Sequence, residues 1–172
     1  MRISSLEEYG LRCALQLARY KLKSELASAS LIAELEGLSV EYVSKIMHLF
    51  RRGGLVQSTR GIQGGFALAK IPSEVSVKEV LDVLAVSQKS PESVEGFCAG
   101  HSGVHEVCVH RSSCQIKPVW SYVFDAFDRV LSGITVADLI EGSPSLMAKL
   151  RVEPKSVPQE TVNVQEQKNE SI

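Results

Sequence analysis

The chain lacks any long run of apolar residues, which excludes a helix that could cross a membrane. Although 44% of its 172 residues are hydrophobic, no uninterrupted stretch approaches the ~20 apolar residues that a bilayer requires. The first residues, MRISSLEEYG, lack the apolar core of a secretory signal peptide. We therefore expect no membrane contact and a location in the cytoplasm, where thiols stay reduced.

Motifs of catalysis are missing as well. The sequence contains neither a glycine-rich nucleotide loop nor a nucleophile paired with a base at a recognisable spacing. We therefore expect that the protein is not an enzyme. A non-catalytic iron–sulfur carrier remains an alternative to a DNA-binding protein.

Acidic residues are absent from one stretch of the chain. Residues 45–70 contain five basic residues and no acidic one, whereas the rest of the chain has 14 basic residues against 20 acidic ones. A net charge of -1 therefore conceals a local charge of +5. Such a segment indicates a polyanionic partner bound by one face; the alternative is an ordinary solvated surface.

The first 84 residues have the pattern of a winged helix-turn-helix. Apolar residues at helical spacing predict three helices, and two strand-like runs separated by a glycine-rich tip then predict a hairpin, the wing. A fourth helix should follow the hairpin. The predicted elements are helices 6–22, 31–36, one from Ser39 to the Gly53-Gly54 pair and 77–84, with strands 55–59 and 66–69.

This arrangement predicts which side chains meet DNA. The exposed side of the third helix should enter the major groove, the arginines at its end should contact phosphates, and the wing should reach the minor groove. The alternative is that these residues are ordinary exposed polar side chains. The predicted contacts are Glu41, Ser44, Lys45, His48, Arg51, Arg52, Arg60 and Gln63.

Cysteine is scarce, and three of the four cysteines lie within 17 residues, at Cys98, Cys108 and Cys114. No helix or strand is expected through this glycine-rich window, so packing does not explain the thiols. Clustered thiols favour an iron–sulfur cluster, a zinc site completed by a nearby histidine (His101, His105 or His110), or a metal-free thiol switch. Cys13, among apolar helical neighbours, is expected to be buried without a role.

The C-terminal part completes a mainly α fold with a small β-hairpin. A helix over 118–131, broken at Ser132-Gly133, carries an apolar stripe that predicts a dimer seam; packing on its own domain is the alternative. The expected divisions are a DNA-binding domain (1–84), a cluster-binding loop (85–116), a dimerisation helix with a short C-terminal helix (117–141), and a disordered polar tail (142–172).

Four segments, MRISSLEEYGLRCALQLA, RGIQGGFALAK, the three-cysteine loop and LSGITVADLI, together resemble the Rrf2 family of winged-helix transcription regulators. The resemblance covers about residues 1–141. It implies a homodimer that binds operator double-stranded DNA with an affinity set by an iron–sulfur cluster.

The resemblance also implies a ligand set. Members of the IscR type place a histidine three residues after the last cysteine, where this chain has Lys117. The sequence is therefore closer to the NsrR type, which favours a 4Fe–4S over a 2Fe–2S cluster on Cys98, Cys108 and Cys114. A carboxylate from the partner subunit, here Glu8, is the implied fourth ligand; an ion pair with Arg12 is the alternative role for Glu8.

Overall fold

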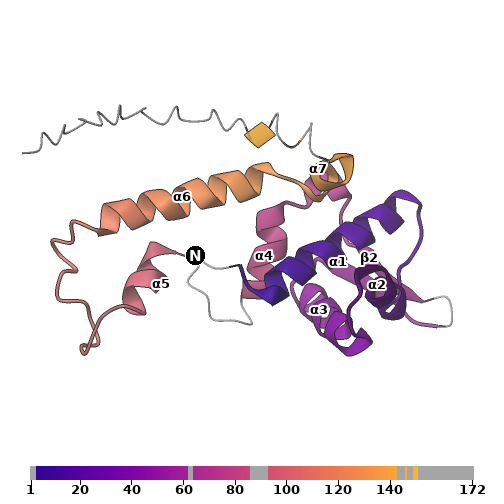
Figure 1. The fold of residues 1–172 in the computed structure, drawn as a ribbon, viewed down its shortest axis with the longest axis horizontal. Coiled ribbons are helices and arrows are strands. Elements are labelled where there is room, and N and C mark those ends of the chain that lie inside the picture. The colour runs from indigo at the N-terminus through magenta and orange to yellow at the C-terminus, as the bar shows by residue number, and fades with distance from the viewer. Residues whose placement is uncertain (1–2, 62–63, 86–92, 143–145, 147–148, 151–172) are drawn as a thin grey trace, which may run out of the picture.

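A computed structural model describes residues 3–61, 64–85, 93–142, 146 and 149–150. As predicted, these residues form helices and one small hairpin (Figure 1). The elements are α1 (Ser5–Leu22), α2 (Ala29–Glu36), α3 (Val40–Arg52), β1 (Val56–Thr59), β2 (Gly65–Leu68), the 3-10 turn η1 (Pro72–Glu74), α4 (Val77–Ala85), α5 (Val94–Ala99), α6 (Lys117–Gly133) and α7 (Val136–Glu141).

Serine caps fix the starts of the first three helices. The hydroxyls of Ser4, Ser28 and Ser39 each accept the backbone amide three residues ahead, which satisfies an otherwise unpaired donor. Helix α2 ends at Gly37, whose φ of 65° lies in the left-handed region that glycine adopts without strain. The caps and the stop together produce the sharp turn between α2 and α3.

The core lies between α1, α3, α4 and the hairpin. Helix α3 turns one apolar side inward, where Val43, Ile46, Met47 and Phe50 are fully buried. Each such side chain contributes roughly 1.5–3 kcal/mol on burial. Because the inner side is committed to this core, the polar side of α3 must face outward.

The wing is an antiparallel pair that is tied to the rest of the domain. Val56 pairs with Leu68 and Thr59 with Gly65. Strand β1 thus starts one residue later than predicted, and β2 starts and ends one residue earlier. Ala27 exchanges backbone hydrogen bonds with Phe66 at 2.8 and 3.0 Å, which fastens the hairpin beside α2. A side chain at Gly65 would put its Cβ 2.9 Å from the Ala27 carbonyl oxygen, so this close approach requires glycine.

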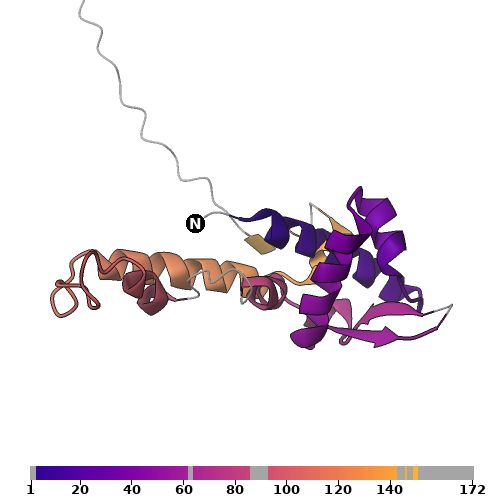
Figure 2. The ribbon, with the colours of Figure 1, turned by 90° about the horizontal axis from the view of Figure 1, so that it is seen from below.

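Helix α6 is anchored at one end and projects away from helices α1–α4 and the hairpin (Figures 1 and 2). The backbone of Val77 donates to Ile134, and Val136 donates to Val75. Lys78 on α4 pairs with Asp128 on α6 at 3.4 Å. The helix thus carries α5 and the cysteine segment to the opposite end of the molecule from the wing.

Two expectations require correction, and two others fall outside the described residues. Cys98 lies on helix α5, so the cysteine window is not free of secondary structure. Gly133 still belongs to α6, which ends where Ile134 becomes extended. Gln63 and most of 142–172 lie outside the described residues. Over the part of the chain described, no helix has the length and apolarity to span a bilayer.

Candidate functional site

The outer side of α3 presents polar and basic side chains to solvent. The predicted residues are all exposed: Glu41, Ser44, Lys45, His48, Arg51 and Arg52. The two arginines occupy the last turn, where positive charge also complements the helix dipole. The face therefore combines groups that can meet base edges with groups that can meet phosphates.

Arg60 extends this basic face onto the wing. It is exposed and directly follows β1. Lys70 differs from the other cations of residues 45–70, because it pairs with Glu79 on α4 at 2.8 Å. This hydrogen bond raises the pKa of Lys70. The other four cations of this segment, Lys45, Arg51, Arg52 and Arg60, are all exposed.

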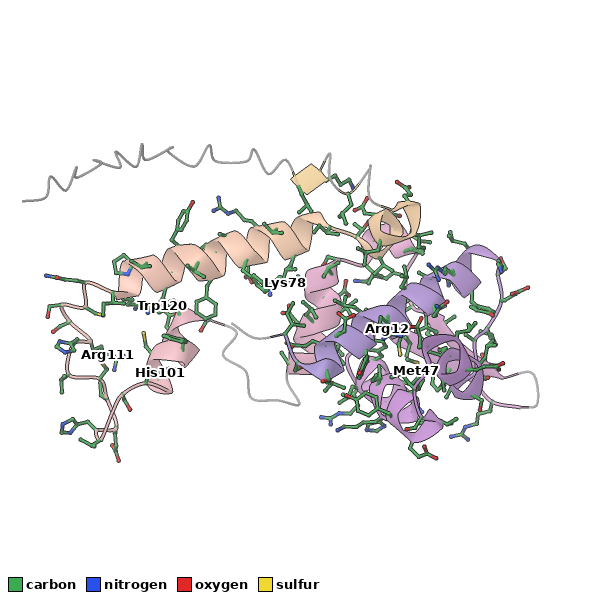
Figure 3. The ribbon with its side chains drawn as sticks, viewed as in Figure 1. Arg12, Met47, Lys78, His101, Arg111 and Trp120 are labelled. Atoms are coloured by element: carbon green, nitrogen blue, oxygen red, sulfur yellow. The ribbon has the colours of Figure 1, made fainter. Side chains whose placement is uncertain are left out.

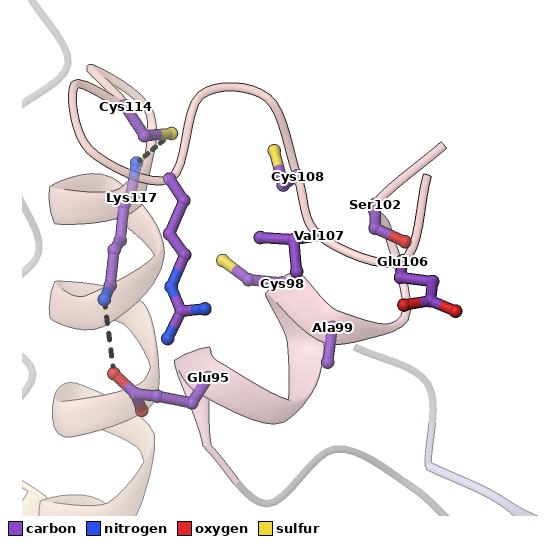
Figure 4. A pocket seen from close by; sticks show the side chains of 10 residues that line it. Glu95, Cys98, Ala99, Ser102, Glu106, Val107, Cys108, Cys114 and Lys117 are labelled. Atoms are coloured by element: carbon purple, nitrogen blue, oxygen red, sulfur yellow. Dashed lines mark hydrogen bonds and ion pairs between the residues drawn. The ribbon is translucent and has the colours of Figure 1, made fainter. Parts of the chain in front are cut away.

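A second site is a cavity of about 240 Å³ that all three clustered cysteines line. All four cysteines of the chain, each described, are free thiols. Cys98 comes from α5, Cys108 from the exposed loop and Cys114 from the residues before α6 (Figure 4). The remaining lining residues are Glu95, Ala99, Ser102, Glu106, Val107, Arg111 and Lys117.

Cys114 also takes part in the start of α6. Its sulfur accepts the backbone amide of Lys117 at 3.3 Å. The thiol is thus positioned by the helix rather than by the loop alone.

An ion pair joins α5 to α6 at the edge of the cavity. The Lys117 ammonium lies 3.4 Å from a carboxylate oxygen of Glu95 (Figure 4). The pKa of Glu95 lies below its ordinary value, mainly because the backbone amide of Glu95 donates to the carboxylate and, second, because Lys117 does. Lys117 therefore contacts a carboxylate rather than pointing freely into solvent.

Aromatic packing also fixes α5 against α6. The centroid of the Phe97 ring lies 4.9 Å from that of Trp120 and 6.1 Å from that of Phe124. Phe97 also stacks on His101, with ring centroids 4.2 Å apart, and His101 Nδ1 is 2.7 Å from the Phe97 carbonyl oxygen. His101 and Trp120 both lie at this end of the molecule (Figure 3). Because Phe97 directly precedes Cys98, these contacts set the position of that thiol.

The structure separates the other proposed ligands from the cavity lining. His101, His105 and His110 are exposed, and none of the three lines the cavity. Within the described residues, no three histidine, cysteine or carboxylate side chains stand close enough together to hold a single metal ion. A preformed Cys₃His zinc site is therefore not present in this arrangement.

Glu8 lies exposed on α1, away from the residues that line the cavity. The alternative role expected for Glu8 was an ion pair with Arg12. Arg12 instead forms its ion pair with Glu36 of α2, through Nε at 2.6 Å. Cys13, on the same helix, is fully buried as expected, and burial raises its pKa to about 12.

Comparisons with known proteins agree with this geometry. A family model described as "Rrf2: Iron-dependent Transcriptional regulator" matches residues 3–142. The chain belongs to the Rrf2 family. A relative from Halalkalibacterium halodurans, named "HTH-type transcriptional regulator NsrR", is 29% identical over 90% of this chain and 100% of its own.

Two solved structures share the fold. IscR of T. potens has a TM-score of 0.60 and 30% identity, over 82% of this chain and 87% of its own. CymR, titled the global cysteine regulator of B. subtilis, has a TM-score of 0.63 and 28% identity, over 82% and 97%. This Rrf2 chain is thus a winged-helix, DNA-binding transcription regulator and not an enzyme, as predicted.

Sequence reasoning missed three parts of the cysteine cavity: helix α5, Glu95 and Arg111. Ser93 caps α5 by accepting the amide of Gly96, and the spacing from Ser93 to Gly100 was a usable signal for a short helix. Glu95 and Arg111 had no such signal, since only the folded loop brings them beside the cysteines.

Proposed function

We propose that this Rrf2 regulator is a cytoplasmic homodimer whose operator affinity is set by an iron–sulfur cluster held by Cys98, Cys108 and Cys114. The observation that carries the proposal is the single cavity lined by all three free thiols. When bound, the cluster supplies reactivity toward oxidants and nitric oxide, or reports iron–sulfur supply.

The donor set fits such a group. Thiolates are the usual ligands of iron–sulfur clusters, and a cluster spans ligands that stand further apart than those around one ion. The cavity, at about 240 Å³, exceeds the ~30 Å³ that one water occupies in the liquid. Three cysteines favour 4Fe–4S, with 2Fe–2S as the alternative. Glu8 of the partner subunit remains the fourth ligand predicted from the family resemblance.

Exposed apolar side chains on α6 support the dimer. No residue along α6, which is described throughout, is fully buried. Val119 is 59% exposed, Tyr122 69% and Val130 48%. The helix spans about 26 Å at roughly 1.5 Å per residue. A second copy of this helix would cover these side chains and bring two recognition helices to one operator.

At the other end of the molecule, α3 and the wing would contact DNA. Lys45, Ser44 and His48 would meet base edges, Arg51 and Arg52 phosphates, and Arg60 the minor groove. Exposure of each of these side chains supports the assignment. Cluster binding would act on this face through α6 and its anchor at Lys78.

The test is anaerobic purification followed by absorption spectroscopy and by iron and sulfide counts. Replacing any one of Cys98, Cys108 or Cys114 by Ala should abolish the visible absorption. Cys13→Ala is the matched control and should keep it, because Cys13 lies in the core. A colourless wild-type protein with stoichiometric zinc would contradict the proposal.

A second candidate is a metal-free thiol switch, which the likeness to CymR, named as a cysteine regulator, favours. The three clustered thiols are free and partly exposed, so oxidation can reach them. DNA affinity of metal-free protein, measured before and after mild oxidation, separates the two. A switch predicts a reversible change without iron; a cluster sensor predicts one only after loading.

A further inference from the structure

We propose that Arg12 of α1 is a positioning residue for base recognition, and that it acts through Glu36 on the turn that leads into α3. Arg12, Gln16 and Glu36 together are called the α1–α2 clamp below. The inference concerns neither the cluster nor the dimer seam. It rests on the proposed function in one respect, since it requires that α3 contacts the bases.

Three hydrogen bonds from α1 converge on Glu36, the last residue of α2. Arg12 (labelled in Figure 3) donates through Nε to the Glu36 carboxylate at 2.6 Å and through Nη2 to the Glu36 backbone carbonyl at 2.7 Å. The side-chain amide of Gln16, a buried residue, donates to the other carboxylate oxygen. Because a helix leaves its last carbonyls unpaired, the clamp satisfies both the side chain and the backbone at the end of α2.

The clamp lies directly before the turn between α2 and α3. Ser39, which caps α3, is only three residues beyond Glu36. On the other side of the turn, Tyr9 of α1 meets Tyr42 of α3 edge to face, with ring centroids 5.7 Å apart. The Arg12 guanidinium lies 5.5 Å from the centroid of the same Tyr9 ring. Arg12 is therefore in contact with the groups that fasten both helices to α1.

Burial makes the clamp specific for arginine. The Glu36 side chain is only 9% exposed, whereas that of Arg12 is 39% exposed. A carboxylate so far removed from water needs a paired cation and several hydrogen bonds. Arginine donates from a planar fork that can reach two acceptors at once, whereas lysine is a point charge. Arg12→Lys therefore keeps the charge but loses the two-point contact with Glu36.

A displaced α3 would affect base contacts more than phosphate contacts. Hydrogen bonds to base edges require donor–acceptor distances of about 2.7–3.2 Å, so Ser44 and Lys45 depend on the exact placement of the helix. Phosphate binding depends mainly on positive charge near the backbone, which the long side chains of Arg51 and Arg52 can supply after a small shift. The clamp should therefore control sequence preference rather than general affinity for DNA.

The experiment measures two affinities of the full-length protein by fluorescence anisotropy. One probe is a duplex that the wild-type protein has selected from a random library, and the other is a random-sequence duplex. Arg12→Lys alters the clamp from α1. Glu36→Gln alters it from α2, because the new amide nitrogen would face one of the two donors. All proteins are compared in the same cluster state, checked by absorption.

Two control variants separate positioning from other effects. Arg19→Lys makes the same replacement at an exposed position of α1, outside the clamp. Val136→Ala removes methyl groups from a fully buried position of α7 and should lower the free energy of unfolding. Chemical denaturation of all four variants reports how much stability each one has lost.

Arg12→Lys and Glu36→Gln should each weaken binding to the selected duplex by about 10-fold, the size of effect expected when a base contact is misplaced. Their affinity for the random duplex should stay at the wild-type value. Arg19→Lys and Val136→Ala should leave the ratio of the two affinities unchanged. If Glu36→Gln does not fold, the ratio in Arg12→Lys decides.

Three results would overturn the proposal. An unchanged ratio in Arg12→Lys would show that the two-point contact is not needed. An equal change of the ratio in Val136→Ala would make general destabilisation the cause. A change in Arg12→Lys without one in folded Glu36→Gln would mean that Arg12 acts on DNA directly. A wild-type protein without preference for its selected duplex refutes base recognition by α3 instead, so the two failures are distinguishable.

Discussion

The basic face of α3 makes a quantitative prediction for Arg52→Ala. Arg52 is exposed in the last turn of the helix, on a segment without acidic residues. A phosphate contact displaces condensed counterions, and its loss reduces the slope of log K against log salt by about 0.9. In a dimer the substitution removes two contacts, so the slope should fall by about 1.8.

That change is large enough to measure. Between 50 and 200 mM salt, a slope difference of about 1.8 changes the affinity ratio by about 12-fold, whereas the ~0.9 expected of one contact changes it about 3.5-fold. The assay is fluorescence anisotropy with a random-sequence duplex over this salt range. A random duplex suffices because phosphate contacts carry the non-specific binding.

Arg19→Ala is the control, since Arg19 is equally exposed but lies in the last turn of α1, outside residues 45–70. It should leave the slope at the wild-type value. An unchanged slope in Arg52→Ala, or an equal change in Arg19→Ala, would refute the assignment of this face. A change near 0.9 would argue that only one subunit contacts phosphate.

One further substitution and one chemical modification test the fold around the sites. Asp138 is buried, accepts from the Thr135 amide at 2.8 Å and pairs with Lys149; Asp138→Ala should lower the free energy of unfolding by about 1–2 kcal/mol at pH 7 in chemical denaturation. Lys149 first, and then the Thr135 amide, lower the pKa of Asp138, so its contribution is present above the unfolded pKa of about 3.9 and is lost as pH falls toward the lower folded value. The difference between wild type and variant should therefore shrink below about pH 4; a constant difference would contradict this reasoning. In cluster-free native protein at pH 8, iodoacetamide should modify the three partly exposed cysteines and spare Cys13, whose pKa is raised by burial to about 12. Mass spectrometry showing early alkylation of Cys13 would contradict the buried position.

Local signals account for most of what the sequence predicted. The caps at Ser28 and Ser39, and the left-handed Gly37 between them, are decided by residues three or four positions apart. The wing likewise depends on a glycine-rich tip between two strand-like runs that are close together in the sequence. These interactions join residues that are close together in the sequence. The sequence pattern therefore predicts the bounds of most elements in residues 1–84 to within one or two residues.

The cysteine site was predicted less well because its contacts are distant in sequence. Helix α5 has only six residues, too few to show a helical period. Its place is set by Trp120 and Lys117, more than 20 residues later. Arg12 shows the same limit, since its partner is Glu36 of another helix and not the nearby Glu8.

The role of Cys114 at the start of α6 bears on how the cysteine spacing can vary. Its sulfur is bonded to the amide of Lys117, so inserting a residue between 114 and 117 would detach the thiol from the helix. The stretch from Cys98 to Cys108 has no such restraint at its exposed turn, where Gly103 has a φ of 75° and Val104 is 97% exposed. Insertions and deletions should therefore be tolerated before Cys108 and rejected between Cys114 and Lys117, which accommodates an interval of nine residues between Cys98 and Cys108.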